Sequence, residues 1–509
     1  MCGIYFYLTF NHLNKKLLLE KGNKCNHRGP DNSTDLFITD NNCNILFLFH
    51  RLSINGLNDK SNQPFQLDGL PHLICMCNGE IYNYKRLAEK YNFILETESD
   101  CEIILHLYNI LPIQEFINEL DGVFSFIIYD KIKKQIYIGH DPFGIRALYY
   151  SIKDNNLSIS SEMKCLDSNY ENNVKFFPPG SYGIYDINSK NLGINNYYNF
   201  IYNTIEDNDT NIKKKIKEKL TKAVEKRLLS DRPIGCLLSG GLDSSIITSI
   251  LKKNNKNLKT FSIGLEGSPD ILSSQIVADY LETDHTNIIV TIEDMLEAID
   301  KTIYQIESYD ITTIRASVPM YLLSKYISEN TDIKVIFSGE GSDEASGSYL
   351  YFHNCPGPDE FQNECIRLLK EVHIFDALRG DKTTSGNGLE IRVPFFDKDF
   401  LSYYMSIDPK QKMVKDGMEK YLLRKSFEND LPEKIVWRRK DGFSDGISTL
   451  EKPWYDIIEE YAQKKYKLNE KDMYKMIYDK YFKSDNIPHY WLPKWSGKID
   501  NPSGRLIIS

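Results

Sequence analysis

A cysteine occupies the second position of the chain, where it could act as a nucleophile. Removal of Met1 would place the thiol and the α-amine of Cys2 on one residue. An α-amine titrates at about 7.7 to 8.0, so part of it is free base at neutral pH and can accept the thiol proton. An ordinary buried thiol is the alternative, and position 2 alone does not decide between them.

Two other groups of residues suit the hydrolysis of an amide. Asn78 and Gly79 offer a side-chain amide beside a glycine N–H, which are suitable donors for a developing oxyanion. A free amino acid substrate also needs partners for its carboxylate and its ammonium, and a guanidinium with one or two carboxylates fits that need. Arg51, Glu80 and Asp100 are therefore candidates for substrate binding.

These residues lie in motifs that resemble the class II glutamine amidotransferases. The matching stretches are Met1-Cys2-Gly3-Ile4, His27-Arg28-Gly29-Pro30-Asp31, Arg51-Leu52-Ser53-Ile54, Asn78-Gly79-Glu80-Ile81-Tyr82-Asn83 and Ser99-Asp100. The resemblance implies an N-terminal-nucleophile hydrolase fold, an αββα sandwich, in which Cys2 attacks the side-chain amide of glutamine and Asn78 and Gly79 form the oxyanion hole. The implied glutamine-binding set is Arg51, Leu52, Ser53, Ile54, Asn55, Asn78, Gly79, Glu80 and Asp100.

Three further residues of this half have two interpretations. His27 could pair with the cysteine as in thiol proteases, but we favour a role in positioning its loop. Cys75 and Cys77 stand two apart in an apolar run and would share one face of a strand. For these two thiols we favour packing over metal binding.

A glycine-rich turn marks the second half of the chain. The turn, Ser239-Gly240-Gly241-Leu242-Asp243-Ser244-Ser245, follows an apolar strand predicted at residues 234–238 and precedes a helical run. Its glycines would let the backbone approach phosphate, its hydroxyls add donors, and the helix N-terminus favours an anion. The turn lacks the lysine of a P-loop, and Asp243 could help to ligate Mg²⁺-pyrophosphate. A tight turn without a ligand is the alternative.

A second cluster, Ser338-Gly339-Glu340-Gly341-Ser342-Asp343-Glu344, follows the strand predicted at residues 334–338. Because the carboxyl ends of parallel strands meet at one edge of a sheet, this cluster would lie beside the glycine-rich turn. The turn resembles that of the N-type ATP pyrophosphatases, which transfer AMP to a carboxylate or carbonyl oxygen. With Asp270 and residues 307–317, 388–395 and 440–446, the chain is similar to the glutamine-hydrolysing asparagine synthetases from Cys2 to about Gly446.

The resemblance implies roles for individual residues of the second half. Asp243 and Asp343 would serve Mg²⁺-pyrophosphate, Lys440 would neutralise charge during adenylation, and Glu340 would help to form or attack β-aspartyl-AMP. A simple loop cap is the alternative for Glu340. The implied ATP-binding set is Leu237, Ser239, Gly240, Gly241, Asp243, Ser244, Ile263, Ser338 and Gly339, and the catalytic set of the whole chain is Cys2, Asn78, Gly79, Glu340 and Lys440.

The expected reaction joins the two halves. Aspartate would attack the α-phosphate of MgATP, glutamine would release ammonia, and a shielded passage would keep that ammonia from protonation in water. The segments 345–348 and 378–382 depart from the usual family text, which bears on aspartate affinity. A β-lactam-forming relative with another acceptor would generally lack Cys2, and a silent binding module would not need the catalytic set. Amidotransferases that make amino sugars or purine precursors would lack the second-half motifs.

The sequence also predicts the elements that position these residues. Strands at 4–10, 45–49, 73–77, 123–129, 135–139 and 148–151, with helices chiefly at 83–91 and 100–109, indicate an α+β domain with antiparallel sheets. A polar stretch at 204–211 places the boundary near residue 208, giving domains 2–208 and 209–509. An amphipathic run at 212–229 follows, and strands at 234–238, 258–263 and 334–338 alternate with helices. The second domain is therefore predicted to be Rossmann-like α/β, with a mainly helical part beyond about residue 360.

Composition excludes several classes of protein. The 509 residues include 41% hydrophobic and 26% charged residues, with no apolar run near the roughly 18 residues of a membrane span. The formal net charge of −9 and the lack of a basic stripe argue against nucleic acid. Ten cysteines without a CxxC pair or an evident targeting segment indicate reduced thiols in the cytoplasm. The resemblance implies glutamine, aspartate, ATP and Mg²⁺ as the partners, and a homodimer is expected from the family alone.

Overall fold

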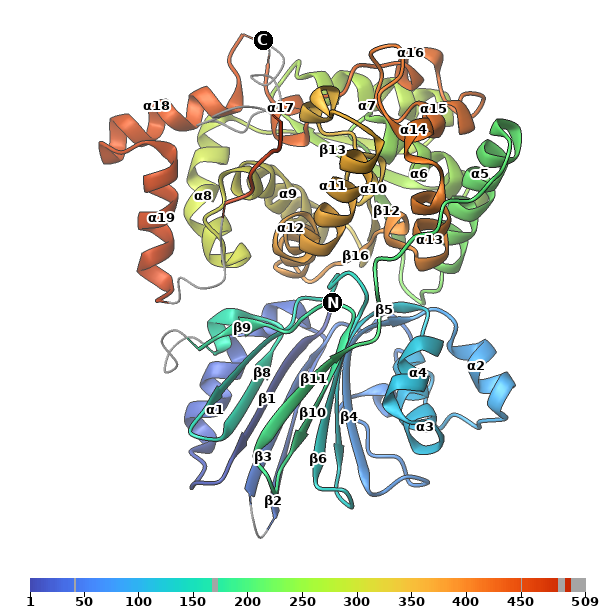
Figure 1. Cartoon of the computed structure of the whole chain (residues 1–509). Coiled ribbons are helices and arrows are strands. Elements are labelled where there is room, and N and C mark those ends of the chain that lie inside the picture. The colour runs from blue at the N-terminus through green and yellow to red at the C-terminus, as the bar shows by residue number, and fades with distance from the viewer. Residues whose placement is uncertain (41–42, 167–172, 450, 484–489, 496–509) are drawn as a thin grey trace.

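The computed structural model of the chain describes residues 1–40, 43–166, 173–449, 451–483 and 490–495. An N-terminal domain of two stacked sheets lies against a C-terminal domain built around a third sheet, and the N-terminus lies at their junction (Figure 1).

The N-terminal domain contains two antiparallel sheets. The first has the strand order β2-β3-β1-β8-β7-β9, with β1 Gly3–Thr9, β2 Asn32–Asp40, β3 Cys43–Arg51, β7 Tyr149–Lys153, β8 Asn156–Ser160 and β9 Lys175–Phe176. The second has the order β11-β10-β6-β5-β4, with β4 Leu73–Ile81, β5 Gly122–Asp130, β6 Gln135–His140, β10 Ser181–Asp186 and β11 Asn191–Asn196. Alternate residues such as Ile4 and Phe6 of β1 pack against Met76 and Ile127 of the facing sheet.

Helices cover the outer faces of both sheets. α2 Tyr84–Tyr91, α3 Ile103–Ile110 and α4 Ile113–Glu119 pack on the second sheet through Leu107 and Phe116. α1 Lys15–Gly22 packs on the first sheet through Leu18. The layers therefore form the predicted αββα sandwich. Cys75 and Cys77 are buried in the apolar cluster beneath α3 and α4, and both are free thiols.

The C-terminal domain contains a parallel sheet in the order β14-β13-β12-β15-β16. Its strands are β12 Ile234–Leu237, β13 Lys259–Gly264, β14 Asp284–Ile289, β15 Val335–Phe337 and β16 Glu390–Arg392, and every pair is parallel. The surrounding helices are α5 Asp209–Lys226, α6 Leu242–Asn254, α7 Pro269–Leu281, α8 Ile292–Ile306, α9 Ile311–Asn330 and α10 Ser342–Ser346. The prediction of a parallel sheet with crossover helices is confirmed.

Helices dominate the chain beyond about residue 360, as predicted. They are α11 Pro358–Glu371, α12 Asp376–Ser385, α13 Lys398–Ser406, α14 Pro409–Lys412, α15 Tyr421–Ser426, α16 Glu433–Val436, α17 Phe443–Gly446, α18 Trp454–Tyr466 and α19 Glu470–Tyr481. The short strand β16 interrupts this series and pairs with β15, so that α12 and β16 lie next to the N-terminal domain (Figure 1).

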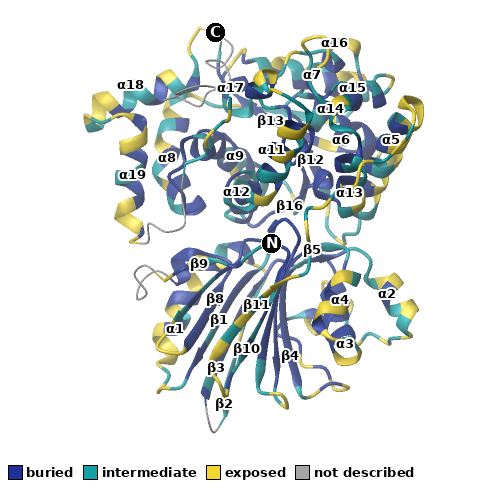
Figure 2. Ribbon diagram, viewed as in Figure 1, coloured by how far each residue is buried: buried dark blue, intermediate teal, exposed yellow. Residues whose placement is uncertain are grey.

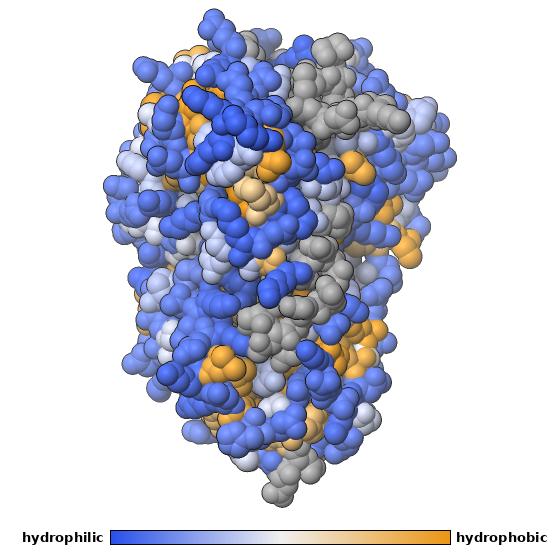
Figure 3. Space-filling model, turned by 90° about the vertical axis from the view of Figure 1, so that its left-hand side faces the viewer, coloured by the Kyte–Doolittle hydropathy of each residue, from blue (hydrophilic) through white to orange (hydrophobic). Residues whose placement is uncertain are grey.

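Burial follows the layers of the two domains. The sheet strands are mostly buried, and the exposed positions gather on the outer turns and helices (Figure 2). One face of the surface is largely hydrophilic, with hydrophobic atoms in separate patches (Figure 3). None of the helices in the described ranges combines the length and apolar character that a bilayer crossing requires.

Candidate active sites

The first pocket lies in the N-terminal domain, where the chain before β1 meets the last residues of β4. Its lining consists of Cys2, Arg51, Leu52, Ile54, Asn55, Gln63, Cys77, Asn78, Gly79, Glu80, Ser99, Asp100, Cys101 and Glu390. Ser53, which belongs to the predicted glutamine-binding set, is not part of this lining. Its backbone N–H donates to Asp31 at 2.8 Å, and its carbonyl accepts from Arg232 at 2.9 Å. The structure therefore brings the other predicted glutamine-binding residues together around one cavity.

Cys2 lies directly beside Asn78 in this pocket. The Cys2 backbone N–H donates to Asn78 Oδ1 at 2.9 Å, and the Cys2 thiol lies 3.7 Å from the Leu52 carbonyl. Within the described residues, the buried Nδ2 of Asn78 has no hydrogen-bond partner. A buried donor without a partner is costly, so this amide nitrogen is suited to an oxyanion that forms beside Cys2.

Burial controls the protonation of the groups around the nucleophile. Burial raises the pKa of the Cys2 thiol to about 11, which keeps it protonated at neutral pH. Burial also lowers the pKa of the Met1 amine to about 6, so that this amine is mostly free base at pH 7. The Met1 amine donates to the Leu389 carbonyl at 3.3 Å. At neutral pH, the N-terminal segment therefore carries an unprotonated Met1 amine next to a protonated Cys2 thiol.

Two carboxylates occupy the other side of the pocket. Asp100 accepts from the Ile81 N–H at 2.6 Å, and the Asn55 side-chain amide donates to Glu80 at 2.5 Å. Burial raises the pKa of Asp100 to about 6, and burial together with the Asp100 charge raises the pKa of Glu80 well above its usual range. An ammonium group bound here would favour the ionised form of both carboxylates.

Arg51 contacts the loop that closes this side of the pocket. Its guanidinium donates to the carbonyls of Asn55 at 3.2 Å and Asn58 at 3.0 Å, to the Gly56 carbonyl, and to Asn62 Oδ1 at 2.8 Å. The guanidinium thus orders residues 55–62 as well as lining the cavity. Arg51 could therefore act on the substrate directly or through this loop.

Replacing Asp100 with asparagine should raise the KM for glutamine about ten- to a hundredfold, because a hydrogen bond to a charged group contributes roughly 1.5 to 3 kcal/mol. In the unchanged protein, KM should rise as pH falls below about 6, because protonation of Asp100 would remove the partner that the resemblance implies for the substrate ammonium. Glutamate release measured from pH 5 to 8 checks both effects. The control is Asp130→Asn, a buried residue bonded to Tyr108 outside the pocket. A pH profile unchanged by Asp100→Asn would contradict the assignment.

The second pocket lies at the carboxyl edge of the parallel sheet. Among its lining residues are the following members of the predicted sets: Leu237, Ser239, Gly241, Asp243, Ser244, Ile263, Ser338, Gly339, Glu340, Asp343 and Lys440. Gly240 is outside the lining but shapes the turn, because its φ is +70° and a Cβ there would lie 2.3 Å from the Ser273 carbonyl carbon. The pocket is larger than the first, about 1190 Å³ against about 360 Å³.

Two aspartates and two lysines form a charged cluster beside the glycine-rich turn. Lys420 donates to Asp243 at 2.6 Å and also contacts Asp343, and Lys440 donates to Asp343 at 2.5 Å. The two ammonium groups hold the pKa of Asp343 well below its usual range despite the burial that opposes ionisation. Ser342 donates to the other oxygen of Asp243 at 2.7 Å. Asp343 is therefore ionised, and both carboxylates contact an ammonium group.

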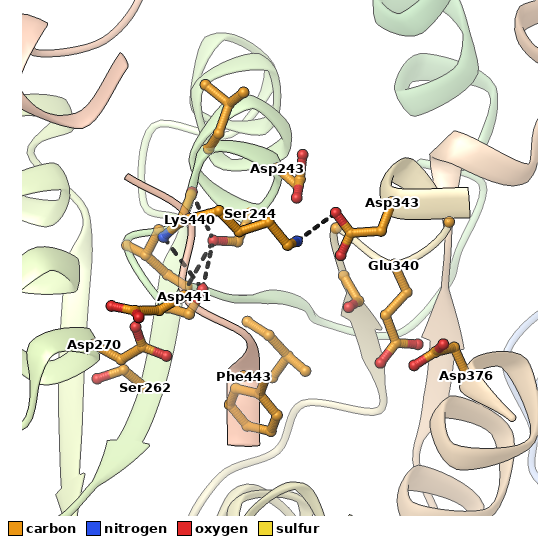
Figure 4. A pocket seen from close by; sticks show the side chains of 18 of the residues that line it. Asp243, Ser244, Ser262, Asp270, Glu340, Asp343, Asp376, Lys440, Asp441 and Phe443 are labelled. Atoms are coloured by element: carbon orange, nitrogen blue, oxygen red, sulfur yellow. Dashed lines mark hydrogen bonds and ion pairs between the residues drawn. The ribbon is translucent and has the colours of Figure 1, made fainter. Parts of the chain in front are cut away.

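Glu340 lies on a different side of the same pocket. One of its oxygens accepts from Arg379 at 3.1 Å, and Arg379 also lies 2.8 Å from Asp376. The other oxygen is buried and has no hydrogen-bond partner in the part of the chain that the structure describes. Burial raises the pKa of Glu340 to about 7. The carboxylates of Glu340 and Asp376 point toward one another, apart from Asp243 and Asp343 (Figure 4).

The position of Glu340 bears on its alternative role as a loop cap. α10, which begins two residues later at Ser342, has Gly341 as its N-cap and no side-chain cap. The side chain of Glu340 is directed to Arg379 instead. The pocket therefore contains a buried carboxylate with one free oxygen, which could accept a proton from a substrate group.

The contacts of the His27 side chain are to residues outside both pockets. Its Nε2 lies 3.0 Å from Gln305 Nε2 and 3.7 Å from a Glu162 oxygen. Burial lowers its pKa. These contacts to the interface between the domains agree with our preference for a positioning role.

Several pocket residues were not identified from the sequence. Lys420, Asp376 and Arg379 line the second pocket, and Glu390 comes from β16 of the C-terminal domain yet lines the first. Lys420 stands in a segment without a recognisable motif, and Arg379 was noted only within a segment that departs from the family text. Glu390 lies in a matched motif, but its position beside the N-terminal pocket depends on how the two domains pack.

Together, the sandwich with its cysteine-containing pocket and the parallel sheet with its glycine-rich turn define a glutamine amidotransferase joined to an ATP pyrophosphatase. Comparison with known protein families agrees. A family model described as glutamine amidotransferase domain matches residues 1–192, and one described as asparagine synthase matches residues 215–357 and 355–490.

Individual relatives match over the whole chain. The asparagine synthetase [glutamine-hydrolyzing] of Mus musculus is 40% identical over 562 aligned residues, which cover 100% of this chain and 98% of that protein. The proteins of the same name from Gallus gallus and Homo sapiens are 39% and 38% identical over 561 aligned residues, with the same coverage. This chain belongs to the family of glutamine-hydrolysing asparagine synthetases.

Proposed function

We propose that this protein makes asparagine from aspartate, using ATP and the amide nitrogen of glutamine. The other products are glutamate, AMP and pyrophosphate. The observation that carries the proposal is the presence of both pockets on one chain that matches asparagine synthetases over its full length. Our preferred boundary between the two activities is residue 208, immediately before α5 begins at Asp209.

In the first pocket, Cys2 would be the nucleophile. Once Met1 is removed, the Cys2 nitrogen becomes the free amine, and it could accept the thiol proton directly or through water. The thiolate sulfur then bonds to the side-chain carbonyl carbon of glutamine, and the C–N bond breaks to release ammonia. Asn78 Nδ2 and the Gly79 N–H would stabilise the oxyanion. Water then hydrolyses the thioester to glutamate.

In the second pocket, the β-carboxylate of aspartate would attack the α-phosphorus of ATP. The bond between the α-phosphorus and its bridging oxygen breaks, and pyrophosphate leaves. Lys440 and Lys420, which contact Asp343 and Asp243, would neutralise the charge that develops on that leaving group. Ammonia then attacks the acyl carbon and displaces AMP, and the free oxygen of Glu340 would accept the proton that the nitrogen loses.

The cluster of Asp243 and Asp343 fits a magnesium ion that arrives with the nucleotide. Mg²⁺ in nucleotide sites is bound by one or two carboxylates together with phosphate oxygens and water. Both aspartates contact the same ammonium group of Lys420, so they lie close enough to share one cation. Bound Mg²⁺ would neutralise the phosphates.

Replacing Lys420 with methionine should lower the Tm of the protein without ligand by roughly 5 °C, because breaking a buried ion pair leaves charge uncompensated. Mg²⁺ should then raise the Tm of this variant more than that of the unchanged protein, since it replaces the lost cation beside Asp243 and Asp343. Thermal unfolding with and without millimolar Mg²⁺ checks the prediction. Lys412→Met is the matched control, because this lysine is also buried but contacts Gln362 and Met405. An equal Mg²⁺ effect in all three proteins would contradict a site at the two aspartates.

The test of the function is product analysis with glutamine labelled at its side-chain amide nitrogen. The protein, with Cys2 as its N-terminus, is given ATP, Mg²⁺ and aspartate. Label in asparagine, with AMP and pyrophosphate formed in equal amounts, supports the proposal. Formation of ADP, or of AMP without asparagine, would overturn it and indicate another acceptor. Omission of aspartate serves as the control.

Two expectations about the protein's setting stay predictions. Its ten cysteines are free thiols, which agrees with a reducing compartment such as the cytoplasm. The homodimer is expected from the family alone. Sedimentation of the purified protein would decide the oligomeric state.

A further inference from the structure

Arg28 is a fully buried arginine whose guanidinium lies between the two domains. Its Nε donates to the backbone carbonyl of Cys2 at 2.9 Å. Its Nη1 donates to Glu162 of the same domain at 2.7 Å, and its Nη2 donates to Asp381 of the C-terminal domain at 3.1 Å. Each of the three guanidinium nitrogens therefore holds a different group, and one of those groups is the backbone of the nucleophile.

Asp381 completes this arrangement from α12. Its side chain is 1% exposed, and its second oxygen lies 2.8 Å from Arg28 Nη1, so the carboxylate faces the fork of the guanidinium with both oxygens. Arg146 Nη1 lies 3.9 Å from the Asp381 oxygen that accepts from Arg28 Nη2. Paired contacts of this kind fix the plane of a guanidinium as well as its position. Asp381 does not line either pocket.

A second set of buried charges fixes α12 itself against the N-terminal domain. Lys382 contacts Glu307 and lies 3.5 Å from Glu162. Glu307 in turn accepts from the backbone N–H groups of Met163 at 2.8 Å and Lys164 at 2.7 Å. Because these groups are buried on both sides of the interface, α12 cannot shift without breaking several charged contacts. The location of Asp381 is thus determined by how the domains pack.

We propose that Asp381 is a positioning residue for glutamine hydrolysis. Through Arg28, it holds the backbone of Cys2 in place. This inference rests on the proposed role of Cys2 as the nucleophile. Without the aspartate charge, Nη2 of the buried guanidinium loses its charged acceptor, while Nη1 keeps Glu162, so the guanidinium can rotate toward Glu162. Nε would then leave the Cys2 carbonyl. The glutaminase site is therefore completed by a residue of the synthetase domain.

This role predicts a specific kinetic signature. A misplacement of a nucleophile by about 1 Å can cost on the order of a hundredfold in rate. Asp381→Asn should therefore lower the kcat for glutamine hydrolysis by about ten- to a hundredfold. The KM for glutamine should stay within about twofold, because the pocket lining is unchanged. Asparagine formation from ammonium should be nearly unaffected, since Cys2 takes no part in it.

The experiment uses the full-length protein and measures glutamate release, ammonium-supported asparagine formation and Tm. Asp397→Asn is the matched control: Asp397 is also buried and bonded to an arginine, Arg227, at 2.8 Å, away from both pockets. It should leave the glutaminase kcat unchanged. Arg28→Lys keeps the charge but loses the fork, so it should lower kcat to a similar extent. The double variant of Arg28 and Asp381 should lose no more than Arg28→Lys does.

The outcomes separate the two proposals. A fall in glutaminase kcat at constant KM, with ammonium-supported synthesis retained, supports the role of Asp381. Unchanged kcat in either Asp381→Asn or Arg28→Lys would overturn it, and so would a parallel loss of both activities, which indicates a structural role only. Because glutamate release does not depend on the acceptor, failure of the unchanged protein to make asparagine would count against the proposed function alone.

Discussion

The Cys2→Ala variant should lose glutamine-supported asparagine formation while it keeps ammonium-supported formation. Removing a covalent nucleophile costs on the order of 10⁴-fold or more in rate, since the remaining groups only bind and polarise the substrate. Ammonia from solution bypasses the first pocket, so the second pocket should work at its normal rate. Glutamate release and asparagine formation, each measured with glutamine and with ammonium, check the prediction.

A buried thiol elsewhere in the same domain is the control for this variant. Cys43 is 4% exposed at the start of β3 and does not line the pocket, so Cys43→Ala should keep both activities. If Cys2→Ala still hydrolyses glutamine at more than a small fraction of the normal rate, the nucleophile is another residue. Cys77 and Cys101 would then be the next candidates, because both residues belong to the pocket lining.

Replacing Glu340 with glutamine should have the opposite effect to Cys2→Ala: asparagine formation should be lost, and glutamine hydrolysis should be kept. Asparagine formation should fall by about 10²- to 10⁴-fold with either nitrogen source, because the amide cannot accept the proton that a carboxylate can. Glutamate release should persist, since Cys2 and Asn78 are untouched. The buried oxygen of Glu340 that has no partner among the described residues is the reason for expecting so large an effect. Asparagine, AMP and glutamate measured in one reaction check it.

Glu340 also predicts the pH dependence of the unchanged protein. Burial raises its pKa to about 7, so in the free pocket half of the carboxyls are protonated near pH 7. If the ionised form accepts the proton, glutamine-supported synthesis should fall as pH drops below 7. The matched control for Glu340→Gln is Glu364→Gln, a buried glutamate paired with Arg367 outside the pocket. Normal synthesis by Glu340→Gln would contradict its catalytic role.

Strands that carry a continuous apolar run were predictable from the sequence, including the three-residue β15, and polar strands were not. β3, β4 and β5 carry apolar runs because both of their faces are covered. β2, β11 and β14 lie at sheet edges, and their sequences are rich in Asn, Asp and Thr, which removes the pattern that marks a strand. β8, β10 and β16 were also missed, and β16 has only three residues.

In the candidate sites, too, some residues could be predicted from a local sequence motif, and others are brought to the site only by tertiary packing. Asn78 and Glu80 share one strand, and the turn at 239–245 is one continuous segment, so short motifs were sufficient to identify them. Lys420 reaches the second pocket from the turn before α15 and Arg379 from α12, and neither segment carries a motif of its own. Asp381 acts across the interface between the domains. Their roles follow from side-chain distances that a single sequence does not encode in any local pattern.

The burial of Met1 has a consequence for the timing of protein synthesis. Met1 is 1% exposed, and its amine contacts Leu389, which the ribosome adds almost four hundred residues later. An aminopeptidase needs an accessible chain end, so it must act before the second domain is complete. At roughly 5 to 20 residues per second, this leaves on the order of tens of seconds. Chains that escape processing in this interval would fold with Met1 enclosed. On the proposed role of Cys2, these chains would use ammonia but not glutamine.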